Sequence, residues 1–156
     1  PAKHVAPFRW GVAQDEYAFD KFIATAETGM GRRSVSLSNS QREMLRRAFH
    51  NLFLNAAQAR NGKGVEVVVT SAVEDRRTLK LEIADNGPGI APDVLPKIFT
   101  PFFNTRPEGT GLGLPLVQKA IVSDDGSVEV ASQPGRGTRF VIRLPLAGPP
   151  PDSDRA

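Results

Sequence analysis

The sequence predicts an α+β fold, a two-layer sandwich in which helices cover one face of a sheet. Two patterns lead to this prediction. Several segments alternate apolar and polar residues, which is typical of strands with one buried face. Other segments repeat apolar residues every three or four positions, which is typical of amphipathic helices. At 156 residues the chain has the size of one domain with one core.

Composition excludes several classes of protein. The net charge of +3 is small and the basic residues are scattered, so nucleic-acid binding is not expected as the main role. The absence of cysteine excludes disulfides, thiolate metal sites and cysteine nucleophiles. No stretch approaches the roughly 20 apolar residues of a membrane span, and no signal-peptide pattern opens the chain. We therefore expect a soluble cytoplasmic domain without membrane contact.

The first part of the chain is predicted to contain a linker, a short amphipathic helix and an edge strand. Residues 1–13 contain two prolines and no sustained period, which indicates a linker or a fragment of an upstream region. Residues 15–28 have helical spacing, ended by Gly29 and Gly31. Residues 34–37 alternate as an edge strand does.

A long helix should follow, capped by Ser38 or Ser40. Its predicted buried stripe comprises Leu45, Phe49, Leu52, Ala56 and Ala59. The neighbouring stripe comprises Met44, Ala48, Asn51, Asn55 and Gln58. Because this second stripe changes from apolar to amide side chains along one line, we expect it to border a polar cavity.

The remaining elements complete the two layers. Strands are predicted at 65–73, 78–84, 127–131 and 138–144, with apolar residues on one face and charged residues such as Lys80 and Glu82 on the other. A short helix should begin at Pro92, and a last helix should span 112–123. The inward side chains predicted for that last helix are Leu116, Val117, Ala120 and Ile121. We place the domain at residues 14–146 and expect 147–156 to be disordered.

Three elements, in order, describe a pocket for a nucleotide and its metal. Two asparagines four residues apart, Asn51 and Asn55, can offer amide oxygens, the hard ligands that Mg²⁺ prefers. Residues 85–90 read DNGPGI, and the acidic side chain on this glycine turn can accept a hydrogen bond from a base. Residues 109–114 read GTGLGL before a helix, where backbone N–H groups can face phosphates.

Each element also has an ordinary explanation. A D-N-G segment is typical of a hairpin turn, but a helix and not a strand should follow it here. A buried asparagine commonly bonds a backbone group. A glycine run can be a flexible loop, although GTGLGL lacks both the ending of a Walker loop and a strand directly before it.

Together these motifs closely resemble the ATP-binding catalytic domain of sensor histidine kinases, in the superfamily of gyrase B, the heat-shock chaperone ATPase and MutL. NLFLNAAQA resembles the N box, DNGPGI and GTGLGL the two glycine boxes, and KIFTPFF (97–103) the F box. GRGTRF (135–140) matches the family's last element. The segment NTRPEGTGLGL (104–114) is most similar to the nitrogen-regulation type of sensor kinase. The resemblance implies a mixed, mostly antiparallel sheet.

The resemblance also implies roles for single residues. Asp85 would receive the adenine amino group, directly and through a water held with Thr138. Asn55 would hold Mg²⁺, and Asn51 would help fix the metal and phosphates. In a short lid, Arg106 is our candidate for neutralising γ-phosphate charge. The predicted catalytic residues are Asn51, Asn55 and Arg106. The predicted nucleotide-binding residues are Asn51, Asn55, Asp85, Gly87, Gly89, Ile90, Thr105, Arg106, Gly109, Thr110, Gly111, Leu112, Gly113, Leu114 and Thr138.

The function that follows is transfer of the ATP γ-phosphoryl group to a histidine. Neither His4 nor His50 has the sequence context of the family's acceptor, so we expect the acceptor on a separate dimerisation domain of a homodimeric full-length protein. A response regulator would act downstream. One alternative is a gyrase- or MutL-like ATPase, but those relatives have a glutamate base where Asn51 stands, and an amide cannot take a proton from water. An anti-sigma-type serine kinase or a scaffolding pseudokinase is the other alternative.

Overall fold

The computed structural model describes residues 3–4, 8–10, 38–59, 66–74, 77–103 and 113–146, with backbone alone at 3–4, 8–10, 57–59 and 73. The strands run in the order β1-β3-β4-β6-β5, and β2 also pairs with β3. Their bounds are β1 Lys3–His4, β2 Phe8–Trp10, β3 Val67–Glu74, β4 Thr78–Asp85, β5 Ser127–Ser132 and β6 Thr138–Pro145. The helices are α2 Asn39–Ala59, the 3₁₀ helix η1 Leu95–Lys97 and α3 Gly113–Ser123.

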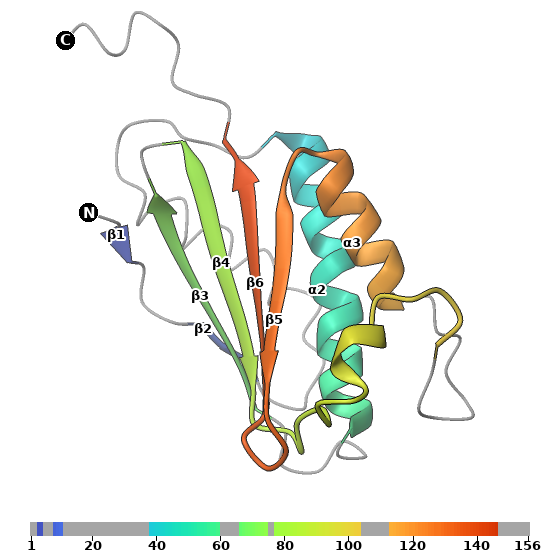
Figure 1. Cartoon of the computed structure of the whole chain (residues 1–156). Coiled ribbons are helices and arrows are strands. Elements are labelled where there is room, and N and C mark those ends of the chain that lie inside the picture. Colours follow the sequence, from blue (N-terminus) through green and yellow to red (C-terminus); the bar gives the residue numbers. More distant parts are fainter. Residues whose placement is uncertain are drawn as a thin grey trace, which may run out of the picture.

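Helices α2 and α3 lie together on one side of the sheet, as Figure 1 shows. Every pair between the described strands is antiparallel. The two-layer sandwich predicted from the sequence is therefore confirmed.

Alternating side chains on β4 and β6 build the sheet side of the core. Leu79 pairs with Leu144, and Leu81 pairs with Ile142 one step along the same face. All four of these side chains are at most 1% exposed, so the pairing fills the interior between the sheet and the helices. This confirms the buried face that alternation predicted.

The start of α2 is fixed by reciprocal hydrogen bonds between Ser38 and Gln41. The Gln41 backbone N–H donates to Ser38 Oγ (3.1 Å), and the Ser38 N–H donates to Gln41 Oε1 (3.0 Å). This is a capping box, and it identifies Ser38 as the cap in place of Ser40. The buried Gln41 side chain also donates from Nε2 to Asp124 Oδ2 (3.2 Å) and to the Pro145 carbonyl (2.9 Å). One side chain thus links α2 to the turn after α3 and to the end of β6.

The buried face of α2 follows the predicted stripe. Its members within the described side chains are Leu45, Phe49, Leu52 and Ala56, each at most 4% exposed. In α3, Val117 and Ile121 are buried as predicted, and Ala120 is half-buried. The prediction for Leu116 was wrong, because 56% of this side chain is exposed. Since α3 packs through one narrow face, Leu116 falls on its edge, beside Val117.

The N-terminal residues contain two strands that the sequence did not reveal. Lys3 and His4 pair with Val73 and Ala72, and β2 pairs with residues 67–69 of β3. These strands have two and three residues, too few for an alternation to be recognisable. Whether 1–13 also serves as a linker to an upstream region stays a prediction.

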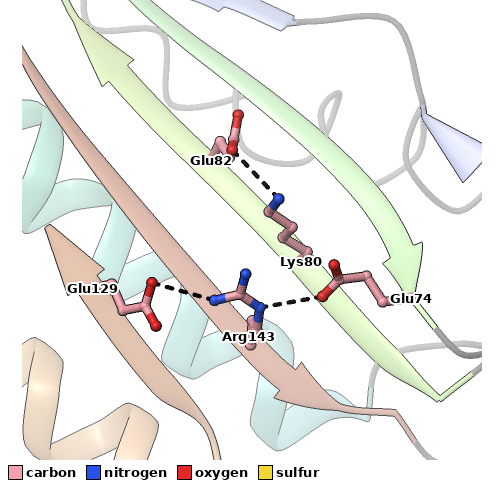
Figure 2. Close-up of polar contacts among 5 residues, drawn as sticks. All are labelled: Glu74, Lys80, Glu82, Glu129 and Arg143. Carbon is pink, nitrogen blue, oxygen red and sulfur yellow. Dashed lines mark hydrogen bonds and ion pairs between the residues drawn. The ribbon is translucent and has the colours of Figure 1, made fainter. Parts of the chain in front are cut away.

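The face of the sheet away from α2 and α3 carries charged side chains, as Figure 2 shows. Arg143 on β6 lies between two carboxylates, with Nε 3.2 Å from Glu74 on β3 and Nη1 3.5 Å from Glu129 on β5. On β4, Lys80 Nζ is 3.6 Å from Glu82. Such partly exposed pairs contribute little stability each, but they confirm that this face is polar.

Several predicted elements lie outside the described residues. They are the helix at 15–28, the strand at 34–37, the side chains of Gln58 and Ala59, and the tail at 147–156. The domain bounds of 14–146 stay a prediction. The short helix expected from Pro92 through Lys97 forms only in its second half, as the 3₁₀ helix η1, with a turn before it. No helix in the described part of the chain has the length and apolar character needed to cross a membrane.

Two buried polar side chains should respond oppositely to truncation. Gln41→Ala should lower the free energy of unfolding by about 2–3 kcal/mol, because Ser38, Asp124 and Pro145 lose partners. Ser71→Ala should be neutral or stabilising by up to about 1 kcal/mol, since the Ser71 hydroxyl is buried without a partner among the described residues. Urea unfolding of both variants tests this. A larger loss for Ser71→Ala than for Gln41→Ala would contradict it.

Candidate functional site

Three polar side chains form a row across the end of the sheet. Asp85 ends β4 and pairs with Thr138, which begins β6 and pairs in turn with Ser132 at the end of β5. Because side chains alternate along a strand, these three continue the face that carries the buried Ile83 and Phe140. The row therefore lies on the helix-covered face, where the apolar core ends.

The turn after Asp85 is held by its own side chains. The Gly87 N–H donates to Asp85 Oδ1 (2.8 Å), and the Glu66 N–H donates to Asn86 Oδ1 (2.8 Å). The Asn86 N–H returns a bond to the Glu66 carbonyl (3.2 Å). The chain then runs on through residues 88–94 to η1 without a returning strand. The hairpin-turn alternative for D-N-G is thereby excluded.

Burial of Asp85 changes its acidity. Desolvation raises the pKa of its carboxyl above the ordinary value of 3.8, against the lowering effect of backbone hydrogen bonds from Gly87 and Thr138. The net rise means that the folded protein disfavours the charged carboxylate in the absence of a ligand. A ligand that donated a hydrogen bond to the Asp85 carboxylate would reduce this desolvation penalty, as expected of a ligand-binding carboxyl group.

The loop at 86–90 packs against the turn between β5 and β6. The Gly135 N–H donates to the Pro88 carbonyl (2.7 Å). Gly89 has φ +79°, and a Cβ there would collide with the Gln133 carbonyl. Gly137 has φ +75°, and a Cβ there would collide with the Asp85 carbonyl. Glycine at these two positions is thus required by contact between backbones. The closure of Gly87 and Gly89 against base and ribose stays a prediction.

Ser132 was not among the predicted site residues. Its hydroxyl links the loop at 86–90 to Thr138 in the row of polar side chains. The Ile90 N–H donates to Ser132 Oγ (2.8 Å), and Ser132 Oγ donates to the Gly137 carbonyl (2.8 Å). The hydroxyls of Ser132 and Thr138 are 2.9 Å apart. Sequence alone gives no register between β5 and β6, so the pairing that brings Ser132 to Thr138 was not foreseeable from the alternation.

The predicted metal and phosphate elements meet where α2 passes α3. Asn51 and Asn55 are half-buried, one turn apart on α2. A Cβ built on Gly113, the first residue of α3, would lie 3.8 Å from Asn51 Oδ1. Their role as ligands stays a prediction, beside the alternative that they bond backbone groups. Leu114 packs against the core beside them.

Both groups of residues lie toward one end of the domain. In Figure 1, the end of β4, the turn between β5 and β6 and the C-terminal half of α2 share the lower end. The segment 86–103 leaves the sheet at this end and passes across α2 in this view. Within that segment Ile98 is buried and Phe99 packs on the core, whereas Phe102 is 75% exposed.

Part of the predicted site lies outside the described residues: Thr105, Arg106, Gly109, Thr110, Gly111 and Leu112. His50 is exposed on α2, as expected for a surface residue. No group of three His, Asp or Glu in the described part of the chain converges as a metal site. A metal at Asn55 would therefore need oxygen atoms of water and ligand to complete its coordination.

Comparison with known proteins agrees with this geometry. The model of the family described as histidine kinase-, DNA gyrase B-, and HSP90-like ATPase matches residues 40–148. The sensor histidine kinase ZraS of Escherichia coli K12 is 45% identical over 96 residues, 62% of this chain and 20% of that protein. The sensory histidine kinase/phosphatase NtrB of Rhodobacter capsulatus is 40% identical over 116 residues, 67% of this chain and 32% of that protein.

One solved structure shares the fold and contains a nucleotide analogue. Full-length ShkA in complex with AMPPNP superposes with a TM-score of 0.61 and 32% identity, over 69% of this chain and 22% of that chain. The chain thus spans about a fifth of the length of ZraS and ShkA. The nitrogen-regulation resemblance is consistent with the NtrB match.

Replacing Asp85 by asparagine should stabilise the unliganded protein at neutral pH. A folded-state pKa raised above the unfolded one gives stability below the unfolded pKa that is lost as pH rises through the folded pKa. Asparagine carries no charge to lose, so the stability of Asp85→Asn relative to the native chain should increase from acidic to neutral pH and then level off. Urea unfolding across that pH range measures it.

Asp93→Asn is the matched control, because it makes the same substitution at an exposed position. In the same Asp85→Asn variant, nucleotide affinity should fall by about 1.5–3 kcal/mol, the worth of one charge-assisted bond. A variant less stable than the native chain at neutral pH, with a flat pH profile, would contradict the burial argument.

Proposed function

We propose that this chain, which belongs to the family of histidine kinase-, DNA gyrase B- and HSP90-like ATPases, transfers the γ-phosphoryl group of Mg·ATP to a histidine on a separate domain. Within that family it is an ATP-binding catalytic domain of the sensor histidine kinase kind. The observation that carries this proposal is the approach of Asn51 to Gly113. It sets the amide of Asn51 beside the N-terminus of an 11-residue helix, whose dipole favours phosphate, and Asn55 follows one turn later on α2.

The base would bind at the other part of the site. The Asp85 carboxylate accepts hydrogen bonds only, so it suits the amino group of adenine. Thr138 lies beside it in the strand register and can hold a bridging water. The loop at 86–90 would cover the base, held in place by its contacts with residues 133–137.

A magnesium ion would be held through amide oxygens. Asn55, with Asn51 one turn before it, offers neutral oxygen ligands that fit Mg²⁺ when water and phosphate oxygens complete an octahedron. Such an ion would neutralise charge that develops between the β- and γ-phosphates. The protein's own part is to hold the phosphates in line and exclude competing geometries.

The amide at position 51 favours transfer over hydrolysis. Activation of a water needs a group that takes its proton, and a carboxamide does not. The alternative, a gyrase- or MutL-like ATPase, would need such a base among the residues beside the phosphates. We assign Arg106 to stabilisation of the charge on the γ-phosphate. On the resemblance alone, we propose further nucleotide contacts at Thr105, Gly109, Thr110, Gly111 and Leu112.

The partners follow from the same proposal. The phosphoryl group would pass to a histidine-bearing dimerisation domain of the full-length protein, a homodimer, and then to a response regulator. ZraS and NtrB, by their names, are sensor histidine kinases, which supports partners of these kinds. We place this domain in the cytoplasm and assign any membrane anchor to other parts of the full-length protein.

The isolated chain should bind Mg·ATP, hydrolyse it very slowly and leave itself unlabelled. Neither of its histidines precedes an acidic residue as the family's acceptor does, because Val5 follows His4 and Asn51 follows His50. When a dimerisation domain from a related kinase is supplied, that domain should acquire acid-labile phosphate from γ-labelled ATP. Acid-labile label on His50, or rapid turnover of ATP without a histidine substrate, would favour a different activity.

Removal of one amide should separate metal binding from base binding. Asn55→Ala should abolish measurable transfer in trans, because the proposed magnesium ligand is lost, while metal-free ADP still binds. Arg106→Ala should lower kcat more than it raises KM, because charge on the γ-phosphoryl group shifts mainly in the transition state. The exposed Asn39→Ala at the start of α2 is the control for amide removal. Transfer at the native rate by Asn55→Ala would remove that residue from the site.

A further inference from the structure

The hydrogen bonds around Ser132 Oγ determine where its single proton lies. Ser132 Oγ donates to the Gly137 carbonyl, which can only accept, at 2.8 Å. A serine hydroxyl has one proton and two acceptor lone pairs. Its two remaining contacts, the Ile90 N–H at 2.8 Å and Thr138 Oγ1 at 2.9 Å, must therefore both donate to it. The three bonds use the full capacity of this hydroxyl.

The same count fixes the hydroxyl of Thr138. Its proton points toward Ser132, so the atoms around the other side of Thr138 Oγ1 meet lone pairs and no proton. Thr138 is 8% exposed, and its backbone N–H also bonds the Asp85 carboxylate. At this end of the sheet, Asp85 and Thr138 thus both present acceptors to a bound group.

We propose that Ser132 is a positioning residue that sets the hydrogen-bond polarity of Thr138 and so selects a 6-amino purine over a 6-oxo purine. This inference rests on the proposed nucleotide-binding function and assigns part of its specificity to a residue outside the glycine boxes. An adenine amino group can donate to Asp85 directly, and to a water that uses both of its protons on Asp85 and Thr138 and therefore offers the base a lone pair. The 6-oxo group of hypoxanthine is itself an acceptor and meets lone pairs at both.

This specificity depends on the direction in which the Thr138 hydroxyl points its proton, and the hydrogen bond to Ser132 fixes that direction. Without the Ser132 hydroxyl, Thr138 could turn its proton toward a 6-oxo group or toward the intervening water. The mismatch at Thr138 would then disappear, while the mismatch at Asp85 would remain. The loss of Ser132 should therefore reduce discrimination and not abolish it.

The test compares ATP with inosine triphosphate, which differs in carrying a 6-oxo base. Titration calorimetry with Mg²⁺ gives the dissociation constant of each nucleotide for the native chain, Ser132→Ala, Thr138→Val and the double variant. Ser132→Ala should lower the preference for ATP by about five- to tenfold, the size of one neutral hydrogen bond. Thr138→Val should lower it by a similar factor, through weaker ATP binding.

The double variant shows whether Ser132 acts through Thr138. Its preference should equal that of Thr138→Val alone, because there is no hydroxyl left for Ser132 to orient. Ser132→Thr retains the hydroxyl and should keep the native preference. Ser127→Ala, an exposed serine on the same strand, is the matched control and should leave it unchanged.

The outcomes separate this inference from the proposed function. A native chain that binds neither nucleotide would overturn both. Tight ATP binding with an unchanged preference in Ser132→Ala would overturn the inference alone, as would a further fall in the double variant below Thr138→Val. If Ser132→Ala does not fold, Thr138→Val and Ser132→Thr decide the matter, since an unchanged preference in Thr138→Val leaves no role for the orientation of its hydroxyl.

Discussion

The antiparallel pairing of β4 with β6 is the constraint on which the rest of the structure depends. Eight consecutive residue pairs run from Thr78 with Pro145 to Asp85 with Thr138, and on the helix-covered face three of the four pairs join apolar side chains. The same register then ends on two polar residues that face the helices. A shift by one residue would turn Asp85 and the core leucines to the charged face together. Core and site are therefore specified by a single alignment.

The site end of the sheet is costly to build. The carboxyl of Asp85 is desolvated, Ser132 uses every bond it can make, and the backbone passes so closely at Gly89 and Gly137 that no side chain fits. The apolar pairing of β4 with β6 and the buried stripe of α2 offset this cost. Polar groups in fixed orientations are tolerated where a large core supports them.

Much of this arrangement is legible in the sequence, for a physical reason in each case. The stripes of α2 and the alternation of β4 and β6 depend on periodicity within one segment, so they can be read without knowing the fold. The glycine boxes and the asparagine pair have fixed local spacing. Ser132 and the contact of Gly89 with Gln133 were missed because they depend on how distant segments align. Leu116 was placed inward because its period fits two neighbouring faces of α3, and only packing decides between them.

The hydrogen bonds of Gln41 have a geometric consequence for the far end of α2. They hold the first turn of this 21-residue helix to the turn after α3 and to the end of β6. From Gln41 to Asn55 the helix axis extends about 21 Å, so a tilt of about 5° about the fixed end would move Asn55 by about 2 Å. That displacement equals a whole magnesium–oxygen bond, at about 2 Å. The hydrogen bonds of Gln41, together with the buried stripe of α2, therefore limit how far Asn55 can move at the other end of the domain.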